Sequence, residues 1–183
     1  MVGSSKVKFS VHKEMLCGVS SFFRSAFTGS FREGRQQVME LPEDDPNIFE
    51  LLVQWLYTDK YDLQQSDGPG DSFNYSEGIQ LYCLAEKYDL SALKHKIYRA
   101  FYRETNETKM PPACSDTSYL YENTSAGSPL RQLYAEWWMS HVNLESFEKA
   151  DIQKWLSGQP DLTHDLFLRL CAVAKRYVPK ITR

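Results

Sequence analysis

Apolar residues recur at every third or fourth position in one segment of this chain after another. That spacing places them along one face of an α-helix, and such a face must be buried against another element. A clear case follows the pair Asp45-Pro46, which suits an N-cap and a first helical position. Its apolar face would carry Phe49, Leu52, Val53 and Leu56. The feature predicts a mainly helical chain with few strands.

Two short segments alternate apolar and polar residues instead. They are residues 7–11 and 37–41, and period-two alternation predicts half-buried strands. Helical spacing predicts helices within residues 12–27, with Ser20 as a cap and Gly29 as a stop. Further helices are predicted near residues 81–88, 91–101, 119–121, 128–138, 147–156 and 163–177. Residues 64–74 read as an exposed loop, and 105–115 as a connector.

The buried residues can be predicted from the same patterns. We expect one core formed by Phe9, Leu16, Phe23, Phe27, Phe49, Leu52, Leu56, Leu84, Ala85 and Leu93. In the last helix we expect Leu166, Phe167, Leu170 and Val173 to be buried. Adjacent Trp137 and Trp138 point about 100° apart on a helix. Either one of them faces a groove or a partner, or their helix is packed on two sides.

Composition excludes several classes of protein. With 42% hydrophobic and 25% charged residues, the chain is not a disordered polyelectrolyte. A net charge of −3 argues against broad nucleic-acid binding. No apolar run approaches the length of a spanning helix, so we expect no membrane insertion. The four cysteines lie far apart, which favours reduced thiols in the cytoplasm or nucleus.

Nothing in the sequence makes a convincing catalytic, cofactor or metal site. His12 and Cys17 could be imagined as a dyad, but Cys17 follows Met15-Leu16 and reads as a packing residue. The acidic run Glu43-Asp44-Asp45 reads as a solvated turn with an N-cap rather than a cation site. No glycine-rich phosphate loop is present. We therefore expect no enzyme activity, no cofactor and no metal.

Four ordered segments carry a resemblance to a known family. They are FSVHKEML at residues 9–16, SSFFRSAF at 20–27, VMEL at 38–41 and LAEKYDL at 84–90. They are similar to the patterns F-x-V-H-K-x-x-L, S-x-x-F-x-x-x-F, V-x-L and L-A-x-K-Y-x-L of the BTB/POZ domain family. Their order and spacing hold from Phe9 to about Ile97.

A second pattern lies in the tail. Tyr121 and Thr124, followed by Ser128, Leu130-Arg131 and Leu133, resemble the extension of short BTB proteins of filamentous fungi. The resemblance implies an α+β chain: a BTB/POZ domain at residues 1–104, with a small sheet packed by a helix cluster, then a helical extension at 105–183. In that family a strand and a turn precede the F-x-V-H-K segment. Here only Val2-Gly3 matches its end, so we expect the first strand to be missing.

The family resemblance implies a protein–protein interaction module. Many members bind a cullin scaffold and recruit targets for ubiquitination, and these carry a hydrophobic-x-Glu motif after the F-x-x-x-F helix. The matching positions here are Phe31, Arg32 and Glu33. The alternative is a scaffold for self-association or hetero-oligomerisation, such as that of a transcriptional regulator, that binds no cullin.

Overall fold

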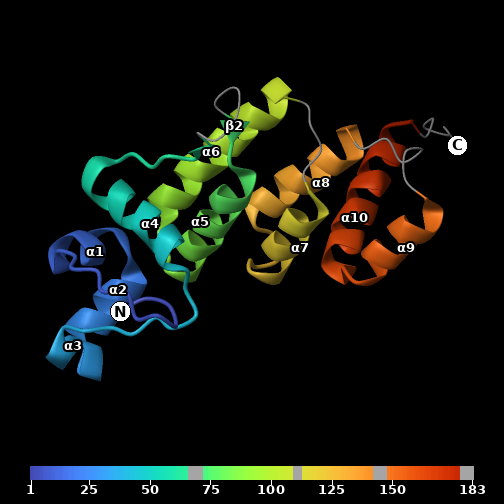
Figure 1. The fold of residues 1–183 in the computed structure, drawn as a ribbon. Coiled ribbons are helices and arrows are strands. Elements are labelled where there is room, and N and C mark those ends of the chain that lie inside the picture. The colour runs from blue at the N-terminus through green and yellow to red at the C-terminus, as the bar shows by residue number, and fades with distance from the viewer. Residues whose placement is uncertain (66–71, 109–112, 142–147, 178–183) are drawn as a thin grey trace, which may run out of the picture. The chain divides into compact units, whose positions relative to one another are not determined.

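The computed structural model describes residues 1–65, 72–108, 113–141 and 148–177. The chain divides into two compact units, Met1–Phe101 and Tyr102–Arg183. In Figure 1 the colour runs from blue at the N-terminus to red at the C-terminus, so the helices of each unit can be followed along the chain. The unit boundary lies inside one helix, which also contains the domain boundary expected after residue 104.

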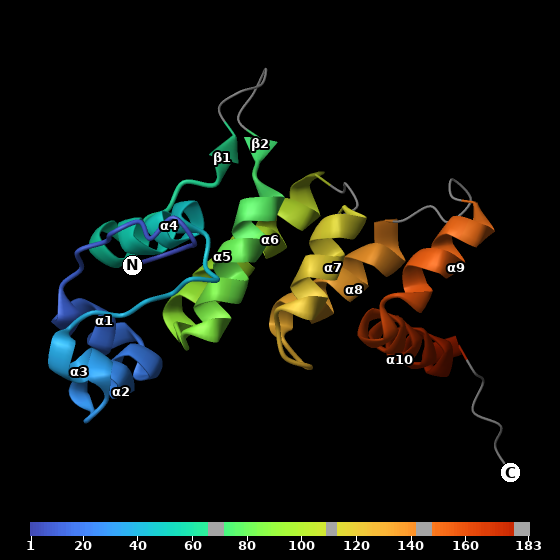
Figure 2. The same cartoon turned by 60° about the horizontal axis from the view of Figure 1, so that its bottom comes forward.

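Helices dominate both units. The first contains α1 (Lys13–Val19), α2 (Ser21–Thr28), α3 (Arg32–Gln36), α4 (Pro46–Thr58), β1 (Gln64–Gln65), β2 (Ser72–Phe73), α5 (Tyr75–Lys87) and most of α6 (Ser91–Thr108). The second contains α7 (Cys114–Glu122), α8 (Pro129–His141), α9 (Lys149–Ser157) and α10 (Pro160–Tyr177). In the first unit α1 packs on α2, α2 on α3 and α4 on α5; in the second, α8 contacts α7 and α10, and α10 contacts α9 (Figure 2).

Side-chain caps fix several helix starts. Ser20 accepts a hydrogen bond from the Phe23 N–H, and Asp45 accepts one from the Asn47 N–H, with Pro46 in the first turn. Such caps satisfy amide groups that have no partner inside the helix. Both caps confirm the sequence prediction, and Gly29 ends α2 as expected.

The predicted strands at residues 7–11 and 37–41 are wrong. Val2 forms single bridges, antiparallel with Val7 and parallel with Leu41, and within the described ranges only the short pair β1–β2 forms a ladder. Pairing stops at one residue because Gly3, at φ 73°, turns the chain directly after Val2. The small sheet of the expected α+β fold is therefore not present in the described part of the chain.

The core of the first unit contains most of the expected residues. Leu16, Phe23, Phe49, Leu52, Leu84, Ala85 and Leu93 are buried, whereas Phe9, Phe27 and Leu56 are only half-buried. In α4 the large Trp55 ring takes the buried position of the last turn, and its indole N–H donates to Asp59 at 3.1 Å. Leu56 is left at the edge of the core.

The second unit departs from prediction at two places. The expected connector at 105–115 is partly helical, because α6 continues to Thr108 and α7 begins at Cys114. The predicted apolar face of α10 is not covered: Phe167, Leu170 and Val173 are exposed and Leu166 is half-buried. Trp137 and Trp138 are both buried, so α8 is packed on two sides.

Candidate protein-interaction surface

The predicted motif lies where α2 ends and α3 begins. Gly29 caps α2 with its N–H donating to Ser25 O at 3.2 Å, and Phe31 is the N-cap residue of α3. The extended backbone of Phe31, with φ −66° and ψ 164°, directs the chain into the short helix. A phenylalanine at an N-cap offers no side-chain oxygen, so capping does not explain its presence.

Two glycines allow α3 to lie close to the end of α2. A Cβ at Gly34 would lie 2.4 Å from Gly29 O, and a Cβ at Gly29 would lie 2.7 Å from Ser25 O. Both contacts are with backbone, which cannot move aside as a flexible side chain would. These positions therefore require glycine, and their packing fixes where Phe31 and Glu33 lie.

The motif borders a shallow groove of about 530 Å³. Helix α2 lines it from Ser21 to Ala26, together with Phe31, Glu33 and, from the end of α5 and the following turn, Lys87 and Asp89. Phe31 is 61% exposed, so its ring is open to a partner. An exposed aromatic beside a groove is the arrangement of an interface anchor.

The charged side chains of this groove differ in whether they already have a partner within the described residues. Lys87 pairs with buried Asp44 at 2.7 Å, and Asp89 accepts a hydrogen bond from Ser21 Oγ. Glu33 has no side-chain hydrogen bond or ion pair among the described residues, and it is half-exposed. Arg32 donates to Gln36 at 2.8 Å and is exposed. Phe31 and Glu33 are thus brought together at the groove, while Arg32 is held along α3.

A buried network supports the far wall of the groove. Asp44 is buried and accepts hydrogen bonds from Lys87 and from the Tyr88 phenol. Ser20 Oγ donates to Tyr88 O at 2.6 Å and so joins the start of α2 to the turn after α5. Burial, and after it the hydrogen bond to Asp44 and the charge of that carboxylate, raise the pKa of Tyr88 far above its ordinary value. These bonds join the start of α2 and the acidic turn to the end of α5, and beyond the acidic turn no sequence pattern indicates them.

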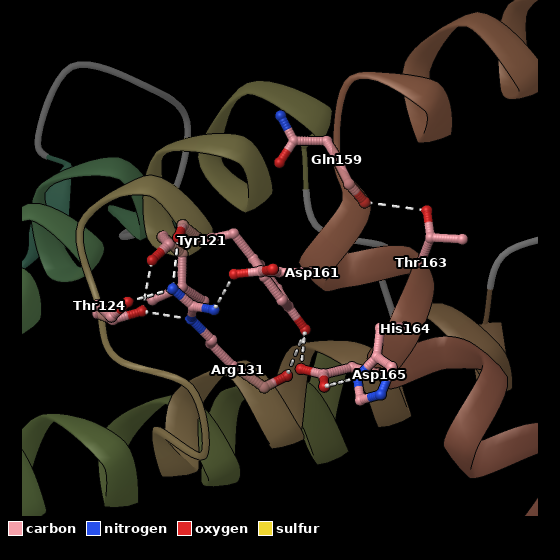
Figure 3. Close-up of polar contacts among 9 residues, drawn as sticks. Tyr121, Thr124, Arg131, Gln159, Asp161, Thr163, His164 and Asp165 are labelled. Carbon is pink, nitrogen blue, oxygen red and sulfur yellow. Dashed lines mark hydrogen bonds and ion pairs between the residues drawn. The ribbon is translucent and has the colours of Figure 1, made fainter.

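In the second unit, sequence reasoning included Arg131 in the tail pattern but missed its role. Arg131 is 3% exposed, and its guanidinium donates to Thr124 Oγ1 at 2.8 Å and to Asp161 at 3.1 Å (Figure 3). It also donates to the carbonyl oxygens of Tyr121 and Thr124, and lies 4.7 Å from the Tyr121 ring centre. The Tyr121 hydroxyl donates to Asp165 at 3.0 Å.

The Arg131 cluster is structural, because its donors are occupied within the unit. It ties the loop between α7 and α8 to the start of α10, which explains the spacing of Tyr121, Thr124 and Arg131 in the sequence. Its guanidinium is buried and already makes four donations to groups of the same unit. It therefore does not compete with the groove at Phe31 as a site of function.

Comparison with known proteins places the first unit. Residues 1–104 match the model of the BTB/POZ domain, which is more than half of the chain. The chain belongs to the BTB/POZ domain family. Its helices α1–α6 and the two bridges at Val2 are thus the BTB/POZ part of the protein. The family carries protein–protein interaction modules, and the first unit is one of them.

The curated relatives of this BTB/POZ protein are much longer chains. The match to Kelch repeat and BTB domain-containing protein 4 of Mus musculus is 31% identical over 80 residues, or 44% of this chain and 15% of the relative. The Homo sapiens protein of the same name is 28% identical over 86 residues, which is 47% of this chain and 14% of the relative. Kelch-like protein 5 of Homo sapiens is 32% identical over 56 residues, 31% of this chain and 7% of its own length.

These matches cover no more than 15% of the relatives' length, so the chain is similar to only a small part of each of them. All three of these relatives are mammalian, and the likeness of the tail to fungal proteins stays a prediction.

Two general observations bear on the site. The described ranges hold no group of three His, Cys, Asp or Glu side chains placed to share a metal ion. In the same part of the chain, no helix combines the length and the apolar content that crossing a bilayer requires.

Proposed function

We propose that this protein is an adaptor that links a cullin-type ubiquitin ligase scaffold to target proteins. The observation that carries the proposal is the position of Phe31, an exposed aromatic at a groove, two residues before Glu33, whose side chain has no hydrogen bond or ion pair among the described residues. Burying one such ring against a partner contributes on the order of 2 kcal/mol. Glu33 at the rim would contribute to specificity and to the rate of association more than to affinity.

The proposal extends to enzyme activity, to the compartment in which the protein acts and to the way it holds its targets. The protein is not an enzyme and needs no cofactor, and it acts in the cytoplasm or nucleus, as the spacing of its cysteines favours. Targets would be held by the second unit, whose exposed apolar residues include Phe167 and Leu170. In this role the tail corresponds to the extension of short fungal BTB proteins.

The test is a pull-down of the full chain on an immobilised cullin N-terminal domain. The intact chain should be retained, and Phe31→Ala should be lost from the beads while its thermal unfolding stays unchanged. Glu33→Gln keeps the shape of the side chain and removes its charge, so it should weaken retention less than Phe31→Ala does. Equal retention of the intact chain and of Phe31→Ala would contradict the proposal.

The alternative function is self-association as a scaffold without a cullin. Size-exclusion chromatography with light scattering separates the two functions. A stable oligomer that no cullin domain binds would favour the scaffold, and a monomer or dimer retained on the cullin beads would favour the adaptor.

A further inference from the structure

Helix α10 of the second unit presents an apolar face that stays exposed among the described residues. Phe167, Leu168, Leu170 and Val173 are between 42% and 61% exposed. The packed side of the helix is a different one, marked by the fully buried Leu162. Large apolar side chains that gather on one exposed surface mark a site of interaction with a partner.

The spacing of these residues fits a second helix lying along α10. Phe167, Leu170 and Val173 follow one another at intervals of three, and Ala174 lies four positions after Leu170. Side chains three and four positions apart share one face of a helix. Together they form a narrow apolar stripe along the helix axis, which one amphipathic helix covers by placing its own apolar residues between them.

The charges of α10 are unevenly distributed along the helix. Its acidic residues lie in the first half and are already engaged within the unit. Asp161 pairs with Arg131 at 3.1 Å, and Asp165 accepts a hydrogen bond from the Tyr121 hydroxyl at 3.0 Å. In the sequence, residues 175–183 contain four basic residues and no acidic one. The apolar stripe therefore runs toward a basic end.

This basic end determines the chemistry of the partner. Lys175 and Arg176 belong to the last turn of α10, which ends at Tyr177. Carboxylates of a partner would be attracted there. Acidic residues are most favourable in the first turn of a helix, where they complement its dipole. A partner helix with acidic residues in its first turn would thus lie antiparallel to α10.

A second copy of the chain and a lipid bilayer fit these charges less well. In an antiparallel pair of α10 helices, the acidic residues brought to each basic end would be Asp161 and Asp165, which are engaged already. A helix that lies on an anionic bilayer carries basic residues along its polar face. In α10 the Asp161 side chain, 67% exposed, lies at the opposite end from the basic residues.

We propose that α10 binds an amphipathic helix of a target protein, whose first turn is acidic and whose apolar residues pack on Phe167, Leu170 and Val173. The inference rests on the proposed function where it describes the partner as a target, and it specifies the kind of target that the second unit holds. The binding itself requires no cullin.

The test titrates the full chain into a fluorescent peptide, EEELAQLLQALAQLLQA, with blocked ends. Its glutamates form the first turn, and its leucines recur at helical spacing. The control peptide QQQLAQLLQALAQLLQA keeps the apolar face and removes the charge. Anisotropy should saturate with the acidic peptide, and the control should bind at least about threefold more weakly.

Matched variants of the chain locate the binding surface. Leu170→Glu should weaken binding of the acidic peptide at least about tenfold without a change in melting temperature, since Leu170 is exposed. Val19→Glu alters an exposed apolar residue of α1 and should leave binding unchanged. Lys175→Glu should weaken binding at least about threefold, whereas Lys60→Glu in the first unit should not.

Four results would overturn the proposal. The first is an acidic peptide that does not saturate the chain at about 1 mM, and the second is equal binding of the two peptides. The third is a dimer of the chain that Leu170→Glu dissociates, because a second copy would then cover the stripe. The fourth is cosedimentation with phosphatidylserine vesicles that Leu170→Glu abolishes, because a bilayer would then be the partner.

The cullin pull-down separates this inference from the proposed function. Leu170→Glu should stay on the cullin beads as the intact chain does, while it loses the acidic peptide. Retention on the beads by a chain that binds no peptide would contradict the α10 surface alone. Peptide binding by a chain that no cullin domain retains would contradict the adaptor function and support the α10 surface.

Discussion

At the scale of single residues, burial in α4 separates two leucines that the sequence pattern treats alike. Leu52 is fully buried, whereas Leu56 is half-buried at the edge of the core. A cavity forms only where surrounding groups cannot close on the missing atoms. Leu52→Ala should therefore lower the free energy of unfolding by about 2–5 kcal/mol, and Leu56→Ala by less than half as much.

Urea unfolding of both variants measures this difference. The residues are four positions apart on one helix and undergo the same substitution, so helix propensity cancels between them. A larger loss for Leu56→Ala than for Leu52→Ala would contradict the deeper burial of Leu52.

The Tyr88 phenol makes the first unit sensitive to alkaline pH. Burial and the neighbouring Asp44 raise its pKa above the ordinary value near 10, so the folded state keeps a proton that the unfolded chain loses. This stabilisation is complete below about pH 10 and is lost as the pH rises further. Tyr88→Phe should reduce stability at pH 8 by about 1–3 kcal/mol, since Asp44 loses a hydrogen bond.

Urea unfolding between pH 8 and 11 tests the sign. Stability of the intact chain should fall above about pH 10, and that of Tyr88→Phe should fall less steeply. Tyr121, whose pKa burial and Asp165 also raise, contributes the same trend in the second unit. If the free energy of unfolding fell equally steeply with pH in the intact chain and in Tyr88→Phe, the Tyr88 phenol would not be the group responsible.

At the scale of elements, the Arg131 cluster holds the second unit together. Removing the buried guanidinium leaves the carbonyl oxygens of Tyr121 and Thr124 without its donations, and each buried acceptor left unsatisfied costs about 1–3 kcal/mol. Arg131→Ala should destabilise the second unit by an amount of this order. Arg131→Lys should restore little, because an ammonium cannot reproduce four directed donations from one planar group.

Arg169 provides the matched control for Arg131. It also forms an ion pair, with Glu136 at 2.6 Å, but the Arg169 side chain is 27% exposed, against 4% for Arg131. Arg169→Ala should cost at most about 1 kcal/mol. In a Trp55→Phe background the remaining tryptophans, Trp137, Trp138 and Trp155, all lie in the second unit, so fluorescence reports its unfolding. Equal losses for the two arginines would contradict a special role for Arg131.

Elements also show where prediction from the sequence succeeds. Caps are local: Ser20 and Asp45 bond to amides two or three residues away, and their chemistry is readable from a short window. Strand pairing is not always local, because one of the two Val2 bridges pairs it with Leu41, far along the chain. Apolar and polar residues do alternate at 37–41, but among the described residues this segment forms only the single bridge of Leu41 to Val2.

Helix α10 shows the limit of apolar spacing. Its packed side carries Leu162 together with Asp165, which bonds Tyr121, and Arg169, which pairs with Glu136. These polar anchors cannot be recognised from hydrophobic periodicity. Spacing identifies residues that share a face and cannot show whether another element covers them, so the prediction for the buried face of α10 is wrong.

At the scale of the whole molecule, a BTB/POZ unit that carries a groove at Phe31 is joined to a helical second unit stabilised by Arg131. The position of the motif is predictable, since it rests on residue types in a short loop. The groove and the free Glu33 are not, because they depend on α2, on the turn after α5 and on two glycine contacts.

The central claim is that Phe31 anchors a cullin-type partner, and calorimetric titration of the full chain with a cullin N-terminal domain tests it most directly. Phe167 is a matched control, because it is also 61% exposed but lies in the second unit. The intact chain and Phe167→Ala should bind with a Kd below about 50 μM, near −6 kcal/mol. Phe31→Ala should lose more than about 1 kcal/mol with its melting temperature unchanged. Absence of binding at these concentrations, or equal losses for the two phenylalanines, would contradict the claim.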